Sequence, residues 1–562
     1  MTMRPYVSLL VAFAIFCPSV SRAQSARGEH GAVATVSALA SQAGVDAMKK
    51  GGNAVDAAVA AALTLGVVNG YNSGIGGGCF ILIRTAQGQI LAIDGRETAP
   101  AAATRDMFIR NGKADPSLST VGALAIGTPG ELAACDLAIQ RAGKLTLRDH
   151  LLAAAQIAAY GFRIDKHYAE VLRHAEPELA KFPTTFSIFH NSLNAPYKEG
   201  DLFRQPDLAH TYRSVANGGI EWFYRGPFAH ATEAWMRANH GILTAADFKN
   251  YRAVLREAIS TDYRGYTVVS FPPPSSGGVH LLEMLNILET RNLGDPSLDR
   301  IDSLHFIAES MKLAFADRAW WLGDPDFVKV PRGLIDKTYA HSLAARINLN
   351  RATDVPGHGV PLDADSNVFP RHTTHISAAD DQGNWVALTA TINTHFGSKV
   401  VIGGTGVVLN NEMDDFSAQP GATNYFGLLG AEANSIAPGK RPLSSMTPTL
   451  VLTNGVPLLS VGAAGGPTII NQTLLNIVDV IDFRRDIQAA VSGPKFHHQW
   501  RPDELKVEQG MDAAAIDGLK RKGHNISVVY SLGAAQGVEK DPSGHGFIGA
   551  ADPRVGGQSA AW

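Results

Sequence analysis

The sequence has little cysteine, little net charge and, beyond its N-terminus, no long apolar run. Only 3 of its 562 residues are cysteine, and Cys17 lies in the N-terminal segment, which leaves Cys79 and Cys135. Two thiols cannot form a disulfide framework for a chain of this size, so we expect two separate buried thiols. The formal net charge of -3 gives no indication of a nucleic acid as a partner.

The N-terminus has the pattern of a signal peptide. Arg4 supplies a positive charge, residues 6–16 are apolar, and Ser21-Arg22-Ala23 forms a small-x-small cleavage site. The apolar run is too short to span a bilayer, and no later stretch predicts a transmembrane helix. We therefore expect a signal peptide over residues 1–23 and a mature protein that is periplasmic or secreted.

Helical periodicity is the main pattern up to about residue 350. An alanine-rich helical region is predicted over 33–68, with a break at Gly51-Gly52 and with Asn53 as the cap of a helix over 54–65. On pattern alone, the chain is a mixed α and β protein with a mainly helical middle from residue 120 to residue 350. The clearest helical patterns there are 132–142, 147–160, 280–290 and 304–321.

A loop and a predicted hairpin follow the helical region. Between residues 352 and 372 the periodicity disappears and glycine and proline recur. A loop of about twenty residues is unusual inside a compact domain unless it is functional or cut. Residues 373–379 and 385–393 are predicted to form two strands joined by a polar turn. A hairpin of this register places Thr391, within one residue, opposite Thr373.

Thr373 lies at the junction of this loop and the first strand, where it is a candidate N-terminal nucleophile. If the chain is cut before it, one residue supplies both a hydroxyl and an α-amine with a pKa of about 7.7 to 8.0, which serves as the base. In an uncut chain that nitrogen is an amide without basicity, so cleavage would be the activating step. By itself, the dipeptide Thr373-Thr374 is also typical of an ordinary strand.

Four further clusters carry groups suited to an amino-acid substrate. An arginine fork can clamp a carboxylate, paired acids can flank an ammonium, and backbone N–H groups of a glycine turn can hold an oxyanion. Each cluster alone is also typical of a solvated turn or a structural ion pair. The candidates are Arg96 for the clamp, Glu412 and Asp415 for the ammonium, Ser444 and Ser445 as hydroxyls, and the turn 462–466 for the oxyanion.

Together these residues carry a resemblance to a known family. From about residue 31 to residue 554 the chain resembles the γ-glutamyltranspeptidases (γ-glutamyltransferases) of the N-terminal-nucleophile hydrolase superfamily. The resemblance implies an α+β fold, the four-layer αββα sandwich, with two antiparallel sheets between helices, built from two chains after self-cleavage. The motifs that carry it are 51–58, 73–78, 96–100, 315–318, 373–375, 410–417, 441–446 and 552–554.

The resemblance also implies how the chain matures and reacts. The precursor would cut itself between His372 and Thr373 into a large subunit, residues 24–372, and a small subunit, residues 373–562, which remain together as a heterodimer. Thr373 would then attack the γ-glutamyl amide of glutathione and related compounds. The γ-glutamyl group would pass to water or to an amino acid or dipeptide acceptor.

Site roles follow from the resemblance residue by residue. It implies neither a metal nor a cofactor, and the pair His497-His498 has no third or fourth ligand at metal spacing. The implied roles are orientation of the nucleophile for Thr391, oxyanion binding for Gly465 and Gly466, α-carboxylate binding for Arg96, Ser444 and Ser445, and binding of the α-amino end for Asn393, Glu412 and Asp415.

Four positions depart from the family pattern. Cys79 replaces a glycine in the glycine run, which we interpret as a packing change. His372 precedes the expected cut, at a position that varies among members. His395 stands where threonine is commoner, next to the expected pocket. Phe426 stands where many bacterial members carry a lid tyrosine, so the lid lacks that hydroxyl and we expect the balance of hydrolysis and transfer to shift.

Two other functions were weighed against this one. A cephalosporin (glutaryl) acylase shares the scaffold, but its substrate side chain has no α-amino group, so Asp415 and Glu412 would be left without a cation. A non-catalytic exported binding protein would need neither Thr373 nor oxyanion donors. The residues therefore favour the γ-glutamyl enzyme over both.

Overall fold

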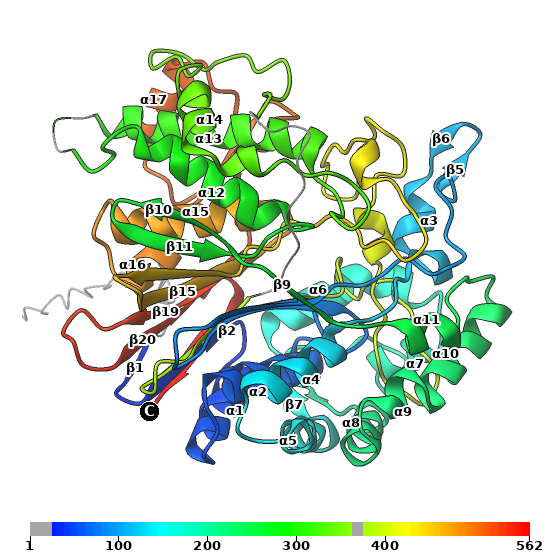
Figure 1. The fold of residues 1–562 in the computed structure, drawn as a ribbon. Coiled ribbons are helices and arrows are strands. Elements are labelled where there is room, and N and C mark those ends of the chain that lie inside the picture. The colour runs from blue at the N-terminus through cyan, green and yellow to red at the C-terminus, as the bar shows by residue number, and fades with distance from the viewer. Residues whose placement is uncertain (1–24, 296, 298, 362–374) are drawn as a thin grey trace, which may run out of the picture.

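Two stacked antiparallel sheets form the centre of the molecule (Figure 1). The computed structural model describes residues 25–295, 297, 299–361 and 375–562. Both sheets have seven strands. In spatial order, the first contains β21 (Gln558–Ala561), β2 (Gly31–Thr35), β12 (Ile376–Asp380), β13 (Trp385–Thr391), β3 (Gly78–Arg84), β4 (Ile90–Gly95) and β9 (Val254–Arg256). The second contains β1 (Ala26–Gly28), β20 (Phe547–Ala551), β19 (Ala534–Lys540), β15 (Val456–Ala464), β14 (Thr449–Thr453), β11 (Tyr266–Ser270) and β10 (Ile259–Tyr263).

Helices cover the outer face of each sheet, which confirms the predicted four-layer sandwich (Figure 1). Between the sheets, Phe80 and Phe271 stack with ring centroids 4.7 Å apart in a buried apolar layer. The first sheet is covered by α1 (Ala38–Lys49), α2 (Ala54–Val68) and α4 (Glu131–Ala142), with α5 (Leu147–Tyr160) and α8 (Pro206–Gly218) packed behind them. The second is covered by α12 (Ser276–Glu289), α15 (Thr468–Ile481) and α16 (Ile487–Ser492), with α13 (Arg300–Trp321) packed on α12.

Shorter elements surround these layers. Among the described residues, no helix combines the length and the apolar character that crossing a bilayer requires. The remaining helices are α3 (Pro116–Thr120), α6 (Lys166–Leu179), α7 (Pro183–Phe189), α9 (Glu221–Tyr224), α10 (Pro227–Ala238), α11 (Ala245–Asn250), α14 (Lys337–Ala344) and α17 (Ala513–Arg521). The small sheets contain β5 (Ile109–Arg110) with β6 (Lys113–Ala114), β7 (Phe162–Arg163) with β8 (Leu202–Phe203), and β16 (Phe496–His497) with β17 (Leu505–Glu508) and β18 (Ile526–Val529).

The predicted helices are confirmed, and so is the cap at Asn53. The Asn53 side chain accepts hydrogen bonds from the backbone N–H groups of Val55 and Asp56, which satisfies the first turn of α2. Cys79 and Cys135 are both free and buried, as expected.

Two parts of the helical prediction are wrong. Residues 33–35 belong to β2, because this segment is buried throughout and hydrogen-bonds to β12 and β21 on either side. The segment 254–270 in the predicted helical middle forms β9, an edge strand of the first sheet, β10, an edge strand of the second, and β11, which lies between β10 and β14. β2, β9 and β11 pair with strands that are distant in the sequence, and local periodicity does not report such pairing.

The predicted hairpin is confirmed within the described residues. β12 and β13 are antiparallel neighbours, with Ile376 paired to Leu388. The second strand is two residues shorter than expected, because the chain turns at Asn393, where φ is +74°. Thr373 and Thr374, at the start of the first predicted strand, lie outside the described residues.

Candidate active site

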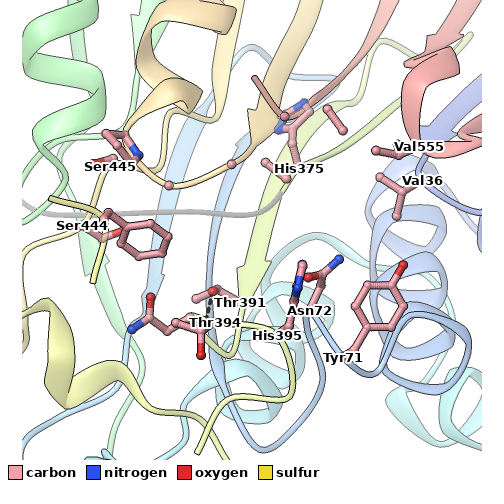
Figure 2. A pocket seen from close by; sticks show the side chains of 18 of the residues that line it. Val36, Tyr71, Asn72, His375, Thr391, Thr394, His395, Ser444, Ser445 and Val555 are labelled. Carbon is pink, nitrogen blue, oxygen red and sulfur yellow. Dashed lines mark hydrogen bonds between the residues drawn. The ribbon is translucent and has the colours of Figure 1, made fainter. Parts of the chain in front are cut away.

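A cavity of about 560 Å³ lies where β13 and β15 end, between the two sheets and the loops that follow them (Figure 2). Figure 2 shows Ser444 and Ser445 on one side of Thr391, and His395 and Tyr71 on the other. Nine of the predicted site residues line this one cavity. They are Arg96, Thr391, Asn393, Glu412, Asp415, Ser444, Ser445, Gly465 and Gly466. The other two, His372 and Thr373, lie outside the described residues.

Thr391 ends β13 and fixes the turn that follows. Its Oγ1 accepts a hydrogen bond of 2.7 Å from the backbone N–H of Asn393. The Asn393 side chain in turn donates to the carbonyl of Asn411 at 3.0 Å. In the described hairpin, Ile376 pairs with Leu388. In an antiparallel pair of this register, the residue opposite Thr391 is Thr373, because 391 − 388 equals 376 − 373. The prediction of a Thr373–Thr391 pair therefore agrees with the register of the described residues.

Gly465 and Gly466 form a turn between β15 and α15. Their φ angles are +133° and +61°, which favour glycine. A Cβ on Gly465 would lie 2.6 Å from Thr468 Oγ1, and one on Gly466 would lie 2.7 Å from Cδ1 of Phe426. The turn sits at the N-terminus of a 14-residue helix, where the helix dipole and free N–H groups favour negative charge. An oxyanion at this turn would be stabilised both by the helix dipole and by hydrogen bonds from the free N–H groups.

Arg96 directly follows β4, and its guanidinium is fully buried among acids. Nη1 lies 2.5 Å from Glu412 Oε2, and Nη2 lies 2.6 Å from Asp415 Oδ2. Glu97 approaches Nη1 at 3.6 Å. In this structure the arginine assigned to the substrate carboxylate thus holds the two acids assigned to the amine, and its role as a carboxylate clamp stays a prediction.

Three acids surround this one arginine, so the carboxyl groups outnumber the cation that they contact. Burial raises the pKa of Glu97 to about 8, although Arg96 opposes the shift. Burial also raises the pKa of Glu412 and of Asp415 against the opposing effect of Arg96, and the charge of Asp415 adds to the shift of Glu412. Buried carboxylates whose pKa values are raised gain most from a nearby cation. A ligand ammonium is therefore favoured beside Glu412 and Asp415.

Arg318 lines the same cavity, and the sequence analysis gave it no role. It lies in the last turns of α13, where Nε donates to Ser276 Oγ at 2.9 Å and Nη2 donates to Ser445 Oγ at 3.3 Å. The backbone N–H of Ser276 donates to the carbonyl of Ser444 at 3.1 Å. The two serines are thus held by α12 and α13 together. The signal in the sequence was a charged pair, Asp317-Arg318, in an otherwise apolar stretch of helix.

His375 is a second lining residue that the sequence analysis left without a role. Its ring is buried beside Gly462, and Nε2 lies 2.6 Å from Ser377 Oγ. Burial lowers the pKa of His375 to about 3. The ring is therefore neutral at physiological pH and adds no charge to the cavity.

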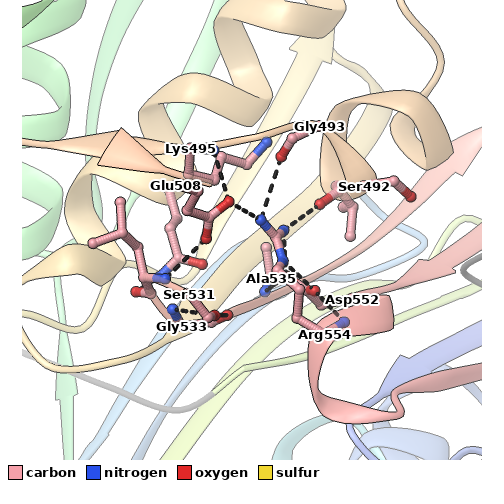
Figure 3. Close-up of polar contacts among 12 residues, drawn as sticks. Ser492, Gly493, Lys495, Glu508, Ser531, Gly533, Ala535, Asp552 and Arg554 are labelled. Carbon is pink, nitrogen blue, oxygen red and sulfur yellow. Dashed lines mark hydrogen bonds and ion pairs between the residues drawn. The ribbon is translucent and has the colours of Figure 1, made fainter. Parts of the chain in front are cut away.

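The C-terminal motif 552–554 is part of an ion-pair network near the glycine turn, and Figure 3 shows Arg554 with Asp552 and Glu508. Arg554 binds Asp552 through two hydrogen bonds of 2.6 Å and also pairs with Glu508. Glu508 accepts the backbone N–H of Leu532 at 2.8 Å, and Leu532 lies against Gly465. An ion-pair network thereby fixes the segment on which the glycine turn rests.

Four buried histidines outside the cavity are held by protein groups. His497 Nδ1 lies 2.8 Å from the amide of Asn471, and His498 Nε2 lies 3.0 Å from Asp503. A separate group of His305, Glu309 and His524 has the proximity of metal ligands. There, the two ring nitrogens face each other at 2.7 Å, and the ammonium of Lys312 lies 3.0 Å from Glu309, where it supplies the positive charge.

The stacked sheets and the cavity at the end of the hairpin define a hydrolase fold of the N-terminal-nucleophile type. Gamma-glutamyltranspeptidase is the family whose model matches this chain, over residues 40–562. The chain belongs to that family and is an enzyme, which confirms the resemblance seen in the sequence.

Relatives cover nearly the whole chain. The glutathione hydrolase proenzyme of Escherichia coli (strain K12) is 42% identical over 535 residues, which cover 94% of this chain and 91% of the relative. The crystal structure of a cephalosporin acylase from Bacillus halodurans matches with a TM-score of 0.87 at 30% identity, covering 98% of this chain and 99% of that one. That of Helicobacter pylori gamma-glutamyltranspeptidase matches with a TM-score of 0.55 at 36% identity, covering 59% and 94%.

Proposed function

We propose that this chain is the precursor of an exported, self-cleaving glutathione hydrolase and γ-glutamyltransferase. In maturation, the Thr373 hydroxyl attacks the carbonyl carbon of His372 and an ester forms as the peptide C–N bond breaks, and the nitrogen takes up the proton of the hydroxyl to become the free amine of Thr373. Water hydrolyses that ester, which restores the Thr373 hydroxyl and leaves His372 with a free carboxylate. The products are the large subunit, residues 24–372, and the small subunit, residues 373–562.

In catalysis, the free amine of Thr373 takes the proton of its own hydroxyl as the oxygen attacks the γ-amide carbon of the substrate. The oxyanion is held by the N–H groups of Gly465 and Gly466. The C–N bond then breaks, the leaving amine takes the proton, and a γ-glutamyl ester of Thr373 remains. Water or the amine of an amino acid or dipeptide acceptor attacks this ester, and the Thr373 hydroxyl is restored.

The main observation behind the proposal is that two buried acids line the same cavity as the glycine turn. Glu412 and Asp415 line the cavity together with Gly465 and Gly466. The acids outnumber the one arginine that pairs with them, which supports a substrate with an α-ammonium, as in a γ-glutamyl group. A glutaryl group has no ammonium, so an acylase would leave these two acids with Arg96 as the one cation paired with them among the described residues.

Export rests on the N-terminal pattern. Arg4, the apolar residues 6–16 and the site at Ser21-Arg22-Ala23 support removal of residues 1–23 and a periplasmic or secreted enzyme. N-terminal sequencing of protein recovered from the periplasm or the medium tests this part, and intact protein that retains residue 1 in the cytoplasm would contradict it.

The first test compares wild-type protein with Thr373→Ala by intact mass and by release of chromogenic amine from γ-glutamyl and glutaryl anilides. We expect wild type to give two fragments that meet at His372 and Thr373 and to cleave the γ-glutamyl anilide. The variant is expected to stay whole and inactive. Cleavage of the glutaryl anilide alone would favour the acylase, and an uncut, inactive wild type would favour a binding protein.

A further inference from the structure

A groove of about 760 Å³ lies between α1 and α5, on the side of the first sheet that faces away from the second (Figure 1). None of its described lining residues belongs to the active-site cavity. Helix α2 contributes Ala60 to the lining, and each of the other two helices contributes a stripe of residues at helical spacing. The apolar side chains of these stripes are Leu39, Ala43 and Ala47 from α1 and Ala153, Ile157 and Tyr160 from α5.

The two helices that line the α1–α5 groove run in opposite directions. α1 and α2 pack as a hairpin joined by a short turn, so they are antiparallel. α2 and α5 are parallel, because Asp56 near the start of α2 accepts the backbone N–H of Leu145 just before α5, at 3.0 Å. At the far ends of these two helices, Gln205 donates to the carbonyls of Val67 and Ala158. The start of α1 therefore lies beside the end of α5.

The charged residues that line the groove differ between its two ends. At the end of α5, Arg163 donates to the carbonyl of Gly200 at 2.8 Å and pairs with no acid among the described residues. At the opposite end lie two exposed acids, Asp46 and Asp149, with one cation, Lys50. The lining is therefore positive at one end and has an excess of acids at the other.

A large aromatic side chain stands exposed at the positive end. Tyr160 is 77% exposed, and Leu39 beside it is 44% exposed. The middle of the groove is lined by the small side chains of Ala43, Ala47 and Ala153, which leave an apolar recess. Exposed apolar groups that adjoin a recess and are bordered by charges are typical of a protein interaction surface.

A second copy of the chain fits this surface because the surface is complementary to itself. A two-fold contact uses the same patch on both copies, so the patch must carry both partners of every interaction. A two-fold axis across the middle of the groove would bring Arg163 of one copy to Asp46 and Asp149 of the other. The same rotation would bring the Tyr160 ring of each copy to the alanine-lined recess of the other. An unrelated partner would not require the cation and the acids, or the ring and the recess, on one surface.

We propose that the α1–α5 groove is the interface between two copies of this chain, with Tyr160 of each copy in the recess of the other and Arg163 facing Asp46 across the two-fold axis. This interface does not depend on the reaction at the active site. It buries the exposed ring, and it pairs charges that have no ion-pair partner within one copy among the described residues.

Sedimentation velocity of purified wild-type protein from about 1 to 100 μM tests this interface, and we expect a dimer that dissociates on dilution. Tyr160→Glu should raise the dissociation constant at least about 30-fold, because both rings of a two-fold contact are replaced by charges. Leu193→Glu is the matched control, since Leu193 is 84% exposed but does not line the groove. It should leave the dissociation constant unchanged. Circular dichroism should be the same for wild type and both variants, because both positions are exposed.

A charge exchange tests the two-fold arrangement itself. Arg163→Glu should raise the dissociation constant about 10-fold or more, because it places an acid against the acids of the other copy. Arg163→Glu combined with Asp46→Arg should recover most of this loss, because the pair is then reversed. The two positions lie at opposite ends of the groove in one copy, so recovery would show that they meet between copies.

Wild-type protein that stays monomeric at about 100 μM would overturn the inference and leave the groove to a partner of another kind. A dimer that Tyr160→Glu leaves intact would also overturn it, because the contact would then lie elsewhere on the surface. A loss in Arg163→Glu that Asp46→Arg does not recover would contradict the two-fold arrangement, and with it the proposed interface.

Discussion

The guanidinium of Arg96 and the carboxylate of Asp415 form an ion pair beside the cavity, with Nη2 2.6 Å from Oδ2. Arg96 follows β4, and Asp415 ends the 3-10 turn Glu412–Asp415. The contact therefore joins residues on opposite sides of position 372. Because the two residues form an ion pair, removing the charge of one changes the electrostatic environment of the other. The effect of a single variant at this pair must therefore be compared with that of a matched control.

Asp415→Asn should weaken the use of substrates that carry an α-amine. We expect kcat/KM on the γ-glutamyl anilide to fall about 10- to 100-fold, because a charged hydrogen bond to the ammonium is lost. The loss on a glutaryl anilide, measured in parallel, should be smaller. Asp414→Asn is the control, since Asp414 is bonded to Ser119 and to the Tyr425 backbone. Equal losses on both anilides would contradict an ammonium role for Asp415.

Thr391→Ala should lower kcat about 100-fold, because the hydroxyl that fixes the turn at Asn393 is removed and the nucleophile loses its neighbour. Thr391→Ser keeps the hydroxyl and should retain most activity. Thr389→Ala is the strand control, since the buried Thr389 hydroxyl has no partner among the described residues. Full activity of Thr391→Ala in cut protein, checked by intact mass, would remove Thr391 from the mechanism.

Gly466→Ala should reduce kcat about 100- to 1,000-fold, the usual effect of losing an oxyanion donor. The added methyl would meet the Phe426 ring at 2.7 Å, so the turn must shift. Gly455→Ala is the control, because Gly455 has a φ of +77° in open space and pays only the backbone penalty. Steady-state kinetics with thermal melting separates the two effects. Comparable kcat in both variants would argue against an oxyanion role.

Phe426→Ala should raise the share of hydrolysis over transfer, because the ring that covers Gly466 no longer excludes water from the turn. Phe426→Tyr tests the effect of the missing hydroxyl at the same position. Tyr425→Ala serves as the neighbouring control, since Tyr425 is 62% exposed. Product analysis at a fixed acceptor concentration gives the ratio. An unchanged ratio in Phe426→Ala would show that the ring does not shield the ester.

Acid should weaken the contribution of buried histidines to stability. Burial lowers the pKa of His375, His497 and His524 to about 3, whereas an unfolded histidine titrates near 6.5. At each of these histidines the unfolded chain binds more protons between these values, so the contribution of each to the free energy of unfolding falls as pH drops from 6.5 toward 3, by up to about 1.4 kcal/mol per pH unit and group. Glu97 and Glu131, whose pKa burial raises to about 8, act in the opposite direction, so the test is the difference between wild type and His524→Gln in denaturant melts. We expect the stability of wild type relative to the variant to fall from pH 6.5 to 4, and a constant difference would contradict the prediction.

Local sequence patterns predicted the elements that depend on local physics. Helix α2 follows from its alanine-rich period and the Asn53 cap, and the β12–β13 hairpin follows from alternation around a polar turn. The strands β9 and β11 were missed because their partners β4 and β14 are distant in sequence, and with them β10, which pairs with β11. Pattern reading cannot report a pairing that forms only in the folded chain.

Some site residues could be predicted from the sequence and others could not. The side-chain chemistry of single residues identified Arg96, Asp415 and the glycine turn as candidates, and the structure brings them into one cavity. The same reasoning could not identify Arg318 or His375, because their place in the cavity depends on their neighbours in the folded chain. Nor could it predict that Arg96 pairs with Glu412 and Asp415, because that contact spans more than 300 residues.

The order of strands constrains how the protein assembles. In the first sheet, β12 and β13 lie between β2 and β3, and in the second, β20 to β14 lie between β1 and β11. A cut after His372 would thus leave two fragments that are interleaved strand by strand, with no domain boundary between them. The chain would therefore have to complete its fold in one piece before such a cut. Once the cut protein was denatured, its recovery would be a bimolecular reaction that depends on concentration, so the cut would make the native state hard to regain.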